Sequence, residues 1–362
     1  MSGSVPDSLE ALPAKSWGKI VARYRTPNTA RGVAEILVTA VPLGLVWTFA
    51  WLAMGRGQWW AILLTVPAAG LVVRLFMIQH DCGHGTLFKS RAANDWVGRV
   101  IGVVTLTPYS HWRQSHGVHH ATSGNLDRRG LGAVEMQTVE EYVAMPPWRR
   151  LIYRLYRHPL VLFGLAPTYL FFLQQRLPVG FMRAGAGPWI GVMGANLAIA
   201  VFIATGILLF GIGPFLLIYI PTLMLAATIG VWLFYVQHQF ERTSWVRQPE
   251  WNPHDAALHG SSYYDLPVAL RWFTANIGVH HVHHLNSRIP FYRMDEVLRD
   301  FPQLRAIGRM TLRDSFATVP LTLWDSQTNR LISFSEAGRL VRARRRSGAK
   351  SGRGQGSSRE LR

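Results

Sequence analysis

The 14 histidines of this chain are strongly clustered, and ten of them lie in four short segments. One segment has the spacing H-x-x-x-H and begins at His80. Two others have the spacing H-x-x-H-H and begin at His116 and His280, while His238 stands within the sequence Q-H-Q-F-E. Imidazole is a common ligand of zinc, copper, iron and nickel. The candidate metal ligands are His80, His84, His116, His119, His120, His238, His280, His283 and His284.

The spacing within each segment predicts a shared helix face. Residues at positions i, i+3 and i+4 of a helix lie on one side, so each segment is expected to present its imidazoles together. His281 falls one residue off that face. Nine imidazoles are too many for one tetrahedral site, and the single cysteine, Cys82, excludes a thiolate cluster. The pattern therefore predicts two metal ions, although ligand type alone does not select iron.

Three polar residues near these segments are candidates for supporting the ligands. Asn276 lies four residues before His280 and could reach a metal through a water, or could serve as a helix cap or a core hydrogen-bonding group. Asp81 and Glu241 could accept hydrogen bonds that orient imidazoles, or could be surface carboxylates. The remaining histidines are expected to be polar residues near the membrane surface: His111, His158, His254 and His259.

The elements that must position these residues are membrane helices. Hydrophobic residues make up 49% of the 362 and charged residues only 16%, which is too apolar for an average soluble protein. About 20 residues cross the hydrocarbon core as a helix. Four apolar runs of this kind form two hairpins, 33–54 with 58–79 and 188–210 with 213–236. The predicted fold class is an all-α integral membrane protein with interfacial helices and a cytoplasmic helical cap that carries the metals.

Charged residues refine this topology. Glu35 lies near the start of the first span, and Arg74 lies late in the second, where its side chain is expected to extend to the membrane surface. Arginines flank residues 159–175 on both sides, so this run is predicted to be interfacial or re-entrant. In the alternative, 159–175 is a true fifth span and 95–108 is a sixth, and the histidine segments stay on the same side of the membrane.

The distribution of Lys and Arg predicts which side faces the cytoplasm. Residues 1–32 are basic and are expected to lie in the cytoplasm, and each hairpin returns the chain to that side. The prediction is a multi-pass protein of the inner membrane, with both termini and the histidines cytoplasmic. Residues 33–338 form the membrane domain, and residues 339–362 are predicted to be a disordered basic tail near anionic lipid. Nucleic acid is not an expected partner.

Three sequence words resemble the histidine boxes of membrane fatty-acid desaturases: HDCGH at 80–84, HGVHH at 116–120 and HHVHH at 280–284. Their flanking residues resemble the bacterial acyl-lipid branch, and the similarity runs from His80 to Tyr292. The resemblance implies two irons, O2 as co-substrate and formation of a cis double bond in a lipid acyl chain. It also implies that the box histidines are ligands and, from the Q-H-x-F-E word, that His238 is a further one.

The resemblance also bears on electrons and substrate. No fused haem-binding cytochrome domain is visible, so an external donor, ferredoxin or a similar carrier, is expected. A basic cytoplasmic surface would attract an acidic carrier. Arg128 and Arg129 follow the second box and could contact a lipid phosphate, or could form a solvated basic turn.

Three other classes of function are weighed against a desaturase. An alkane, sterol or carotenoid hydroxylase or ketolase would share the boxes and differ in product. A metal transporter or haem-binding membrane protein would place ionisable ligands near the bilayer midplane, whereas these histidines lie outside the predicted spans. A purely structural membrane protein would leave ten clustered histidines unexplained.

Overall fold

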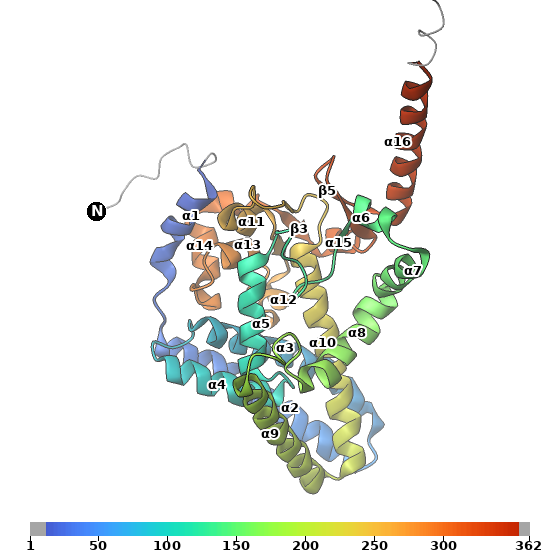
Figure 1. The fold of residues 1–362 in the computed structure, drawn as a ribbon. Coiled ribbons are helices and arrows are strands. Elements are labelled where there is room, and N and C mark those ends of the chain that lie inside the picture. The colour runs from blue at the N-terminus through green and yellow to red at the C-terminus, as the bar shows by residue number, and fades with distance from the viewer. Residues whose placement is uncertain (1–11, 355–362) are drawn as a thin grey trace, which may run out of the picture.

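Four long helices form the membrane layer of the computed structural model, which describes residues 12–354 (Figure 1). Each is long and apolar enough to span a bilayer, which confirms the predicted four-helix count. The second span begins with a 3-10 turn, Trp59–Leu64. The four helices are α2 (Thr29–Gly55), α3 (Thr65–His84), α9 (Ala186–Phe210) and α10 (Ile212–His238).

Local sequence sets the ends of these helices. The side chain of Asn28 accepts a hydrogen bond from the Arg31 backbone N–H at the start of α2. Helix α3 ends at His84 and is capped by Gly85, whose φ of 72° lies in the left-handed region that glycine tolerates. The first box therefore occupies the last turn of α3, and His238 is the last residue of α10.

The prediction that Arg74 reaches the membrane surface is wrong. Its side chain is buried, with 3% exposed, and forms an ion pair with Glu35 of α2. The two residues are 39 positions apart, and their pairing removes the need for either charge to reach water. A buried charge in a membrane protein is tolerated when it has a partner of this kind.

Three further helical segments are not among the candidate spans. Helix α4 (Arg91–Val104) exposes Trp96 and Val100, and α7 (Pro147–Tyr156) exposes Trp148, Leu151 and Ile152. The third segment corresponds to the predicted interfacial or re-entrant run. It consists of π-helical Leu160–Leu165, α8 (Ala166–Thr168), π-helical Tyr169–Leu173 and the 3-10 turn Gln174–Arg176.

The cap above the spans holds the remaining elements. Its strands form two small sheets that the sequence did not predict: parallel β1 and antiparallel β5 flank β4, and β2 pairs with β3 in parallel. The strands are β1 (Gln137–Thr138), β2 (Tyr263–Asp265), β3 (Arg309–Thr311), β4 (Leu321–Asp325) and β5 (Arg330–Ser333). The helices are α1 (Ala14–Ile20), α5 (Tyr109–Thr122), α6 (Val139–Ala144), α11 (Pro253–His259), α12 (Val268–Phe273), α13 (His280–Leu285), α14 (Met294–Asp300), α15 (Leu312–Phe316) and 3-10 turns at Val21–Tyr24, Phe291–Arg293 and Pro302–Arg305.

The basic N-terminal segment contributes to the cap core. Trp17 of α1 and Tyr24 are 3% exposed and belong to the same apolar cluster as Val282 and Leu285 of α13. The apolar residues of this segment therefore lie between cationic ones in the sequence, and they form a face that covers the third box. Residues 1–11 lie outside the described part of the chain.

The predicted disordered tail differs from the structure between residues 339 and 354. Helix α16 runs from Phe334 to Gly354 and projects away from the cap (Figure 1). The Ser333 hydroxyl accepts a hydrogen bond from the Glu336 backbone N–H at its first turn. Arg, Ala and Leu favour helix formation, so the composition that suggested disorder also permits a helix. Residues 355–362 lie outside the described part.

Candidate metal centre

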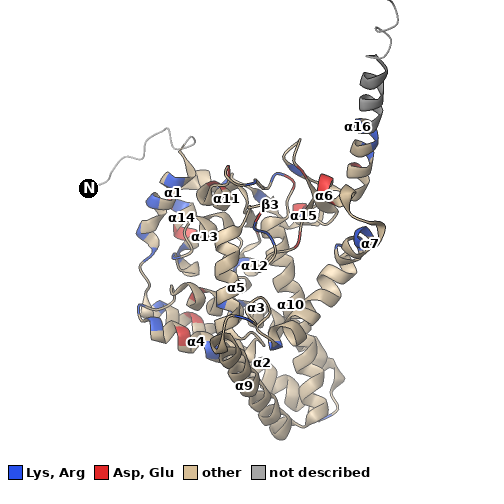
Figure 2. Ribbon diagram, in the orientation of Figure 1, with Lys and Arg blue, Asp and Glu red and all other residues tan. Residues whose placement is uncertain are grey.

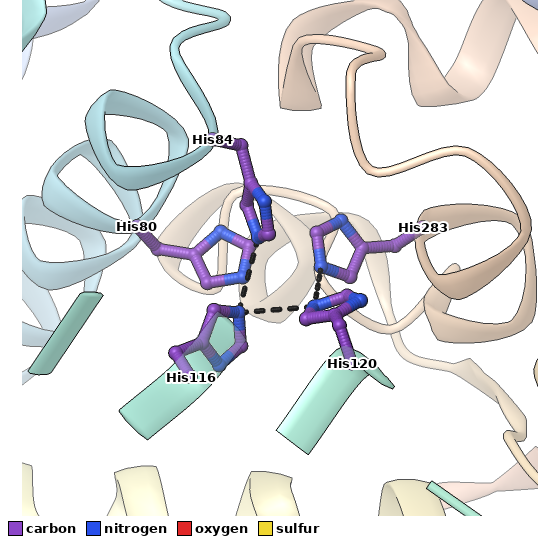
Figure 3. Close-up of side chains that lie close together, drawn as sticks. All are labelled: His80, His84, His116, His120 and His283. Carbon is purple, nitrogen blue, oxygen red and sulfur yellow. Dashed lines mark hydrogen bonds between the residues drawn. The ribbon is translucent and has the colours of Figure 1, made fainter. Parts of the chain in front are cut away.

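All nine predicted ligands lie in two adjoining groups, each with its ligand nitrogens within 4.8 Å of one another. The first, the five-histidine group, takes His80 and His84 from α3, His116 and His120 from α5, and His283 from α13 (Figure 3). Its imidazoles point toward one another in the close-up. The Nε2 atoms of His84 and His116 are 3.0 Å apart, as are those of His116 and His120.

The second, the four-histidine group, consists of His119, His238, His280 and His284. Their Nε2 atoms form a closed ring of contacts. The Nε2 of His119 is 3.1 Å from that of His238 and 3.3 Å from that of His284. The Nε2 of His280 is 3.0 Å from that of His238 and 3.1 Å from that of His284.

The two H-x-x-H-H boxes divide their histidines between the groups in opposite ways. His116 and His120, at i and i+4, serve the five-histidine group, while His119, at i+3, serves the other. In the third box His280 and His284 serve the four-histidine group, and His283 serves the five-histidine group. Each of these two boxes therefore presents its imidazoles to the same adjoining pair of groups but divides them between the two, which helix spacing alone did not specify. Residues at i and i+4 are close enough to share one ion, and i+3 is angularly displaced toward the neighbouring one.

The spacing of the Nε2 atoms fits metal coordination. A metal–imidazole bond is about 2.0–2.1 Å long, so two ligands at right angles around one ion lie about 3.0 Å apart. The Nε2–Nε2 distances of 3.0–3.3 Å within the two groups match that separation. Neutral imidazoles packed this tightly cannot all donate to one another, because each has one N–H. The donor set therefore suits a pair of cations.

Burial keeps these imidazoles neutral. It holds the pKa of His116, His119 and His120 well below the ordinary value, and repulsion among neighbouring histidines lowers the pKa further. The same causes lower the pKa of the third-box ligands. Neutral imidazole is the form that binds metal. The low pKa values therefore favour the ligand state.

A backbone carbonyl orients one ligand, and close packing of α3 against α5 positions another. His238 Nδ1 lies 3.1 Å from the Gly260 carbonyl oxygen, which fixes the tautomer that leaves Nε2 free. Gly83, inside the first box, allows α5 to approach, since a Cβ there would lie 2.8 Å from Trp112. The Trp112 ring in turn stacks on His116 with centroids 4.6 Å apart. The glycine of the first box thus has a packing role that spacing did not reveal.

The predicted supporting residues have different surroundings. Asp81 Oδ1 lies 3.5 Å from His80 Nδ1, and its other oxygen accepts from the Phe291 N–H at 2.8 Å. Asn276 donates to Asp295, so its water-mediated contact with a metal stays a prediction. Glu241 is exposed and pairs with Arg330 at 3.1 Å, which contradicts an imidazole-orienting role. His281 is not in either group and instead contacts the Leu304 carbonyl at 2.9 Å, as its off-face position indicated.

Two openings reach the histidines. An apolar cavity of about 560 Å³ lies between α3, α5, α10 and the helical segment 160–176, and His80, His116 and His280 form part of its wall. Small residues of α10, including Gly230, also line it. A polar surface pocket lined by Gly83, Arg113 and Gly117 reaches His84 and His116 from another side of α5. The five-histidine group therefore lies between an apolar space and a polar one.

The loop after the second box is held by ion pairs. Arg129 donates to both oxygens of Glu141 at 2.9 and 2.7 Å and to the Met136 carbonyl. Arg247 adds a further pair with Glu141. Arg129 is therefore engaged within the protein, whereas Arg128 is exposed. Of the two arginines considered for a lipid phosphate, only Arg128 retains a solvent-facing side chain.

Comparison with known proteins decides the family. The model of the family described as fatty acid desaturase matches residues 57–313, which include all nine histidines. The chain belongs to the fatty acid desaturase family. Its members are oxidoreductases, and this desaturase is accordingly an enzyme of lipid metabolism with a helical membrane architecture.

Individual relatives agree with this assignment. The desaturase is 39% identical over 322 residues to a fatty acid desaturase of Bacillus subtilis, covering 88% of this chain and 90% of the relative. It is 24% identical over 290 residues to an sn-1 oleoyl-lipid 12-desaturase of Synechocystis, covering 80% and 78%. It is also 29% identical over 230 residues to the sn-1 acyl-lipid omega-3 desaturase (ferredoxin) of Synechocystis, covering 61% of each chain.

Proposed function

We propose that this enzyme is an acyl-lipid desaturase that introduces a cis double bond into a membrane lipid acyl chain, with two irons held by the nine histidines. The observation that carries the proposal is the apolar cavity, which connects the membrane helices with His80, His116 and His280. Its volume of about 560 Å³ lies within the range of ligand-binding cavities. An acyl chain in this cavity would pass directly beside both histidine groups.

The reaction sets what the protein must provide. One acyl CH2–CH2 unit loses two hydrogens, and O2, two electrons and two protons complete the conversion to CH=CH and two waters. The irons, when bound, supply the O2 chemistry needed to break an unactivated C–H bond. The nine imidazoles would hold the metals, and burial keeps those of the second and third boxes neutral. The apolar wall, with Phe76 and Leu223, binds the acyl chain and excludes water from it.

We assign electron delivery to a separate carrier, a ferredoxin or a similar protein. One relative carries ferredoxin in its name. The polar pocket supports a position for this carrier, since it reaches His84 and His116 from the surface and includes Arg113. Exposed Lys89 and Arg91 lie close in sequence to the first box, and Asp95 offsets part of this charge by pairing with Arg91 and Arg113. Cationic side chains around the pocket that leads to the metal site favour binding of an acidic partner.

We place the enzyme in the inner membrane with the cap and both termini in the cytoplasm. Lys and Arg gather on the cap and at its border with the spans, whereas the far ends of α9 and α10 carry almost none (Figure 2). The positive-inside rule puts the basic side in the cytoplasm. Cysteine tagging at the Gly211–Gly213 turn and at Ser351 tests this, with label access expected from the periplasm only at the turn.

Expression in a bacterium whose membrane lipids are saturated, followed by mass spectrometry that locates double bonds, tests the function. The expected products are mono-unsaturated acyl lipids that are absent with His119→Ala. Hydroxylated or keto products would instead support the hydroxylase or ketolase alternative. Saturated lipids alone, from a folded enzyme supplied with iron and a reduced carrier, would contradict the proposal.

A further inference from the structure

Arg74 and Glu35 form a buried ion pair inside the membrane layer. Arg74 precedes His84 by ten residues on α3, which places it about 15 Å from the end of that helix. The side chains are 3% and 5% exposed, and Glu35 is also paired with Arg31 at 2.7 Å. Charges within spans are costly and occur where they have a specific partner or task.

Arg74 extends this pair to the segment that carries the third box. Its Nε donates to the Thr39 hydroxyl at 3.1 Å, and its Nη1 donates to the Trp272 carbonyl. The guanidinium also stacks over the Trp272 ring at 4.2 Å and lies 5.5 Å from the Phe291 ring. Trp272 precedes the third box and Phe291 follows it, so one side chain contacts both flanks of α13.

Phe291 continues the connection to the first box. Its backbone N–H donates to the Asp81 carboxylate at 2.8 Å, and Asp81 adjoins His80. The contacts therefore run from α2 through Arg74 to both sides of α13 and return to α3 beside the first ligand. Arg74 is the member of this network that touches α2, α3 and both flanks.

The two histidine groups depend on this network unequally. The five-histidine group takes His80 and His84 from α3 and His283 from α13, so its assembly requires α3 and α13 to keep a fixed separation. The four-histidine group takes no ligand from α3. It is built from α5, α10 and α13, and the Gly260 carbonyl orients His238.

We propose that Arg74 is a positioning residue that holds α3 against the third-box segment and thereby assembles the five-histidine metal site. This inference rests on the proposed two-metal centre. A planar guanidinium suits the task because it can bond a carboxylate and a carbonyl and stack on aromatic rings at once, which a lysine ammonium cannot. A role in general stability would instead affect both metal sites alike.

Anaerobic titration of purified apo-protein with Fe2+ tests the proposal, with bound metal counted per chain and each affinity determined. Wild type is expected to bind two ions. Arg74→Gln is expected to keep one ion at wild-type affinity and to bind the other on the order of tenfold more weakly or worse, the usual effect of losing a residue that orients ligands. Arg74→Lys should give an intermediate loss, because it keeps the charge opposite Glu35 but not the planar contacts.

Two further variants make the test decisive. Trp272→Leu removes the stacking partner and leaves the buried ion pair intact, so it should weaken the same single site even if Arg74→Gln fails to fold. Arg176→Gln is the control, since Arg176 is a second arginine near the spans, partly buried and bonded to Asn196 and the Leu106 carbonyl. This variant should bind two ions as wild type does. Wild-type affinity at both sites in Trp272→Leu, or equal weakening of both relative to wild type, would overturn the positioning role. Failure of wild type to bind two ions would overturn the two-metal centre itself.

Discussion

The two histidine groups differ in how open they are and in how they are held. His84, His116 and His120 of the five-histidine group are partly exposed, and the group adjoins both the apolar cavity and the polar pocket. Three of the four members of the other group are buried, and a backbone carbonyl fixes His238. The difference indicates that the open group needs an external brace, supplied by the Arg74 network, while the enclosed group is held by its own packing.

Removing one ligand from each group has the largest expected effect. His283→Ala and His119→Ala should each abolish desaturation while the fold is retained, because each deletes an imidazole that no neighbour replaces. His283→Ala should lose the ion of the five-histidine group and His119→Ala that of the four-histidine group, as measured by iron per chain. His281→Leu is the control: it should keep two irons and lose about 1–3 kcal/mol of stability, since it leaves the Leu304 carbonyl unpaired. Appreciable activity in either alanine variant would remove that histidine from the ligand set.

Filling the apolar cavity should alter the product without affecting either metal. Gly230 lines the cavity, and a Cβ added there meets no atom within 4 Å. Gly230→Leu should therefore shift the acyl chain and change the chain length or double-bond position of the products, as read by mass spectrometry. Gly164→Leu is the matched control, because Gly164 has equal space but is exposed and does not line the cavity. Unchanged products from Gly230→Leu would place the substrate elsewhere.

Charge in the polar pocket should affect electron delivery more modestly. Gly117 lines this pocket and a Cβ there also meets open space. Gly117→Glu should slow reduction by an acidic carrier several-fold relative to Gly117→Lys, which occupies a similar volume with the opposite charge. Stopped-flow reduction at low and high salt measures this, and salt should narrow the difference. Equal rates for the two variants would move the carrier to another surface.

The smallest expected effect lies away from both groups. Burial would raise the pKa of Glu141, but hydrogen bonds from Arg129 outweigh it and lower the pKa to about 2. Because the folded pKa lies below the ordinary value of 4.5, this carboxylate stabilises the fold fully above about pH 4.5, and the contribution is lost as pH falls toward 2. Thermal unfolding of Glu141→Gln should thus differ from wild type at pH 7 and converge with it in acid, with iron content at pH 7 unchanged. A difference independent of pH would contradict the ion-pair explanation.

Much of this architecture was predictable from residue type and spacing. The apolar runs predicted the four candidate spans, and the three boxes with His238 predicted the nine clustered imidazoles. Helix geometry suffices for both, because its periodicity determines which side chains share a face and its rise per residue determines how long an apolar run must be to cross a membrane.

What the sequence did not predict depends on contacts between distant segments. The division of the second and third boxes between two groups depends on where α3, α5 and α13 meet, which periodicity within one helix does not specify. Glu35 and Arg74 are 39 residues apart, and Arg74 lies 198 residues from Trp272. Trp17 packs in the same cluster as residues of α13, but its basic sequence neighbours gave no indication of an apolar face there. A charged residue in each member of a predicted hairpin is the signal that could have suggested the buried pair.

Anomalous X-ray scattering at the iron edge, from crystals of the iron-loaded enzyme, tests the central claim most directly. The expected map has two peaks, one inside each histidine group, with Nε2 atoms at metal–nitrogen bonding distance. A single peak, or peaks that lie outside these groups, would contradict the two-metal centre.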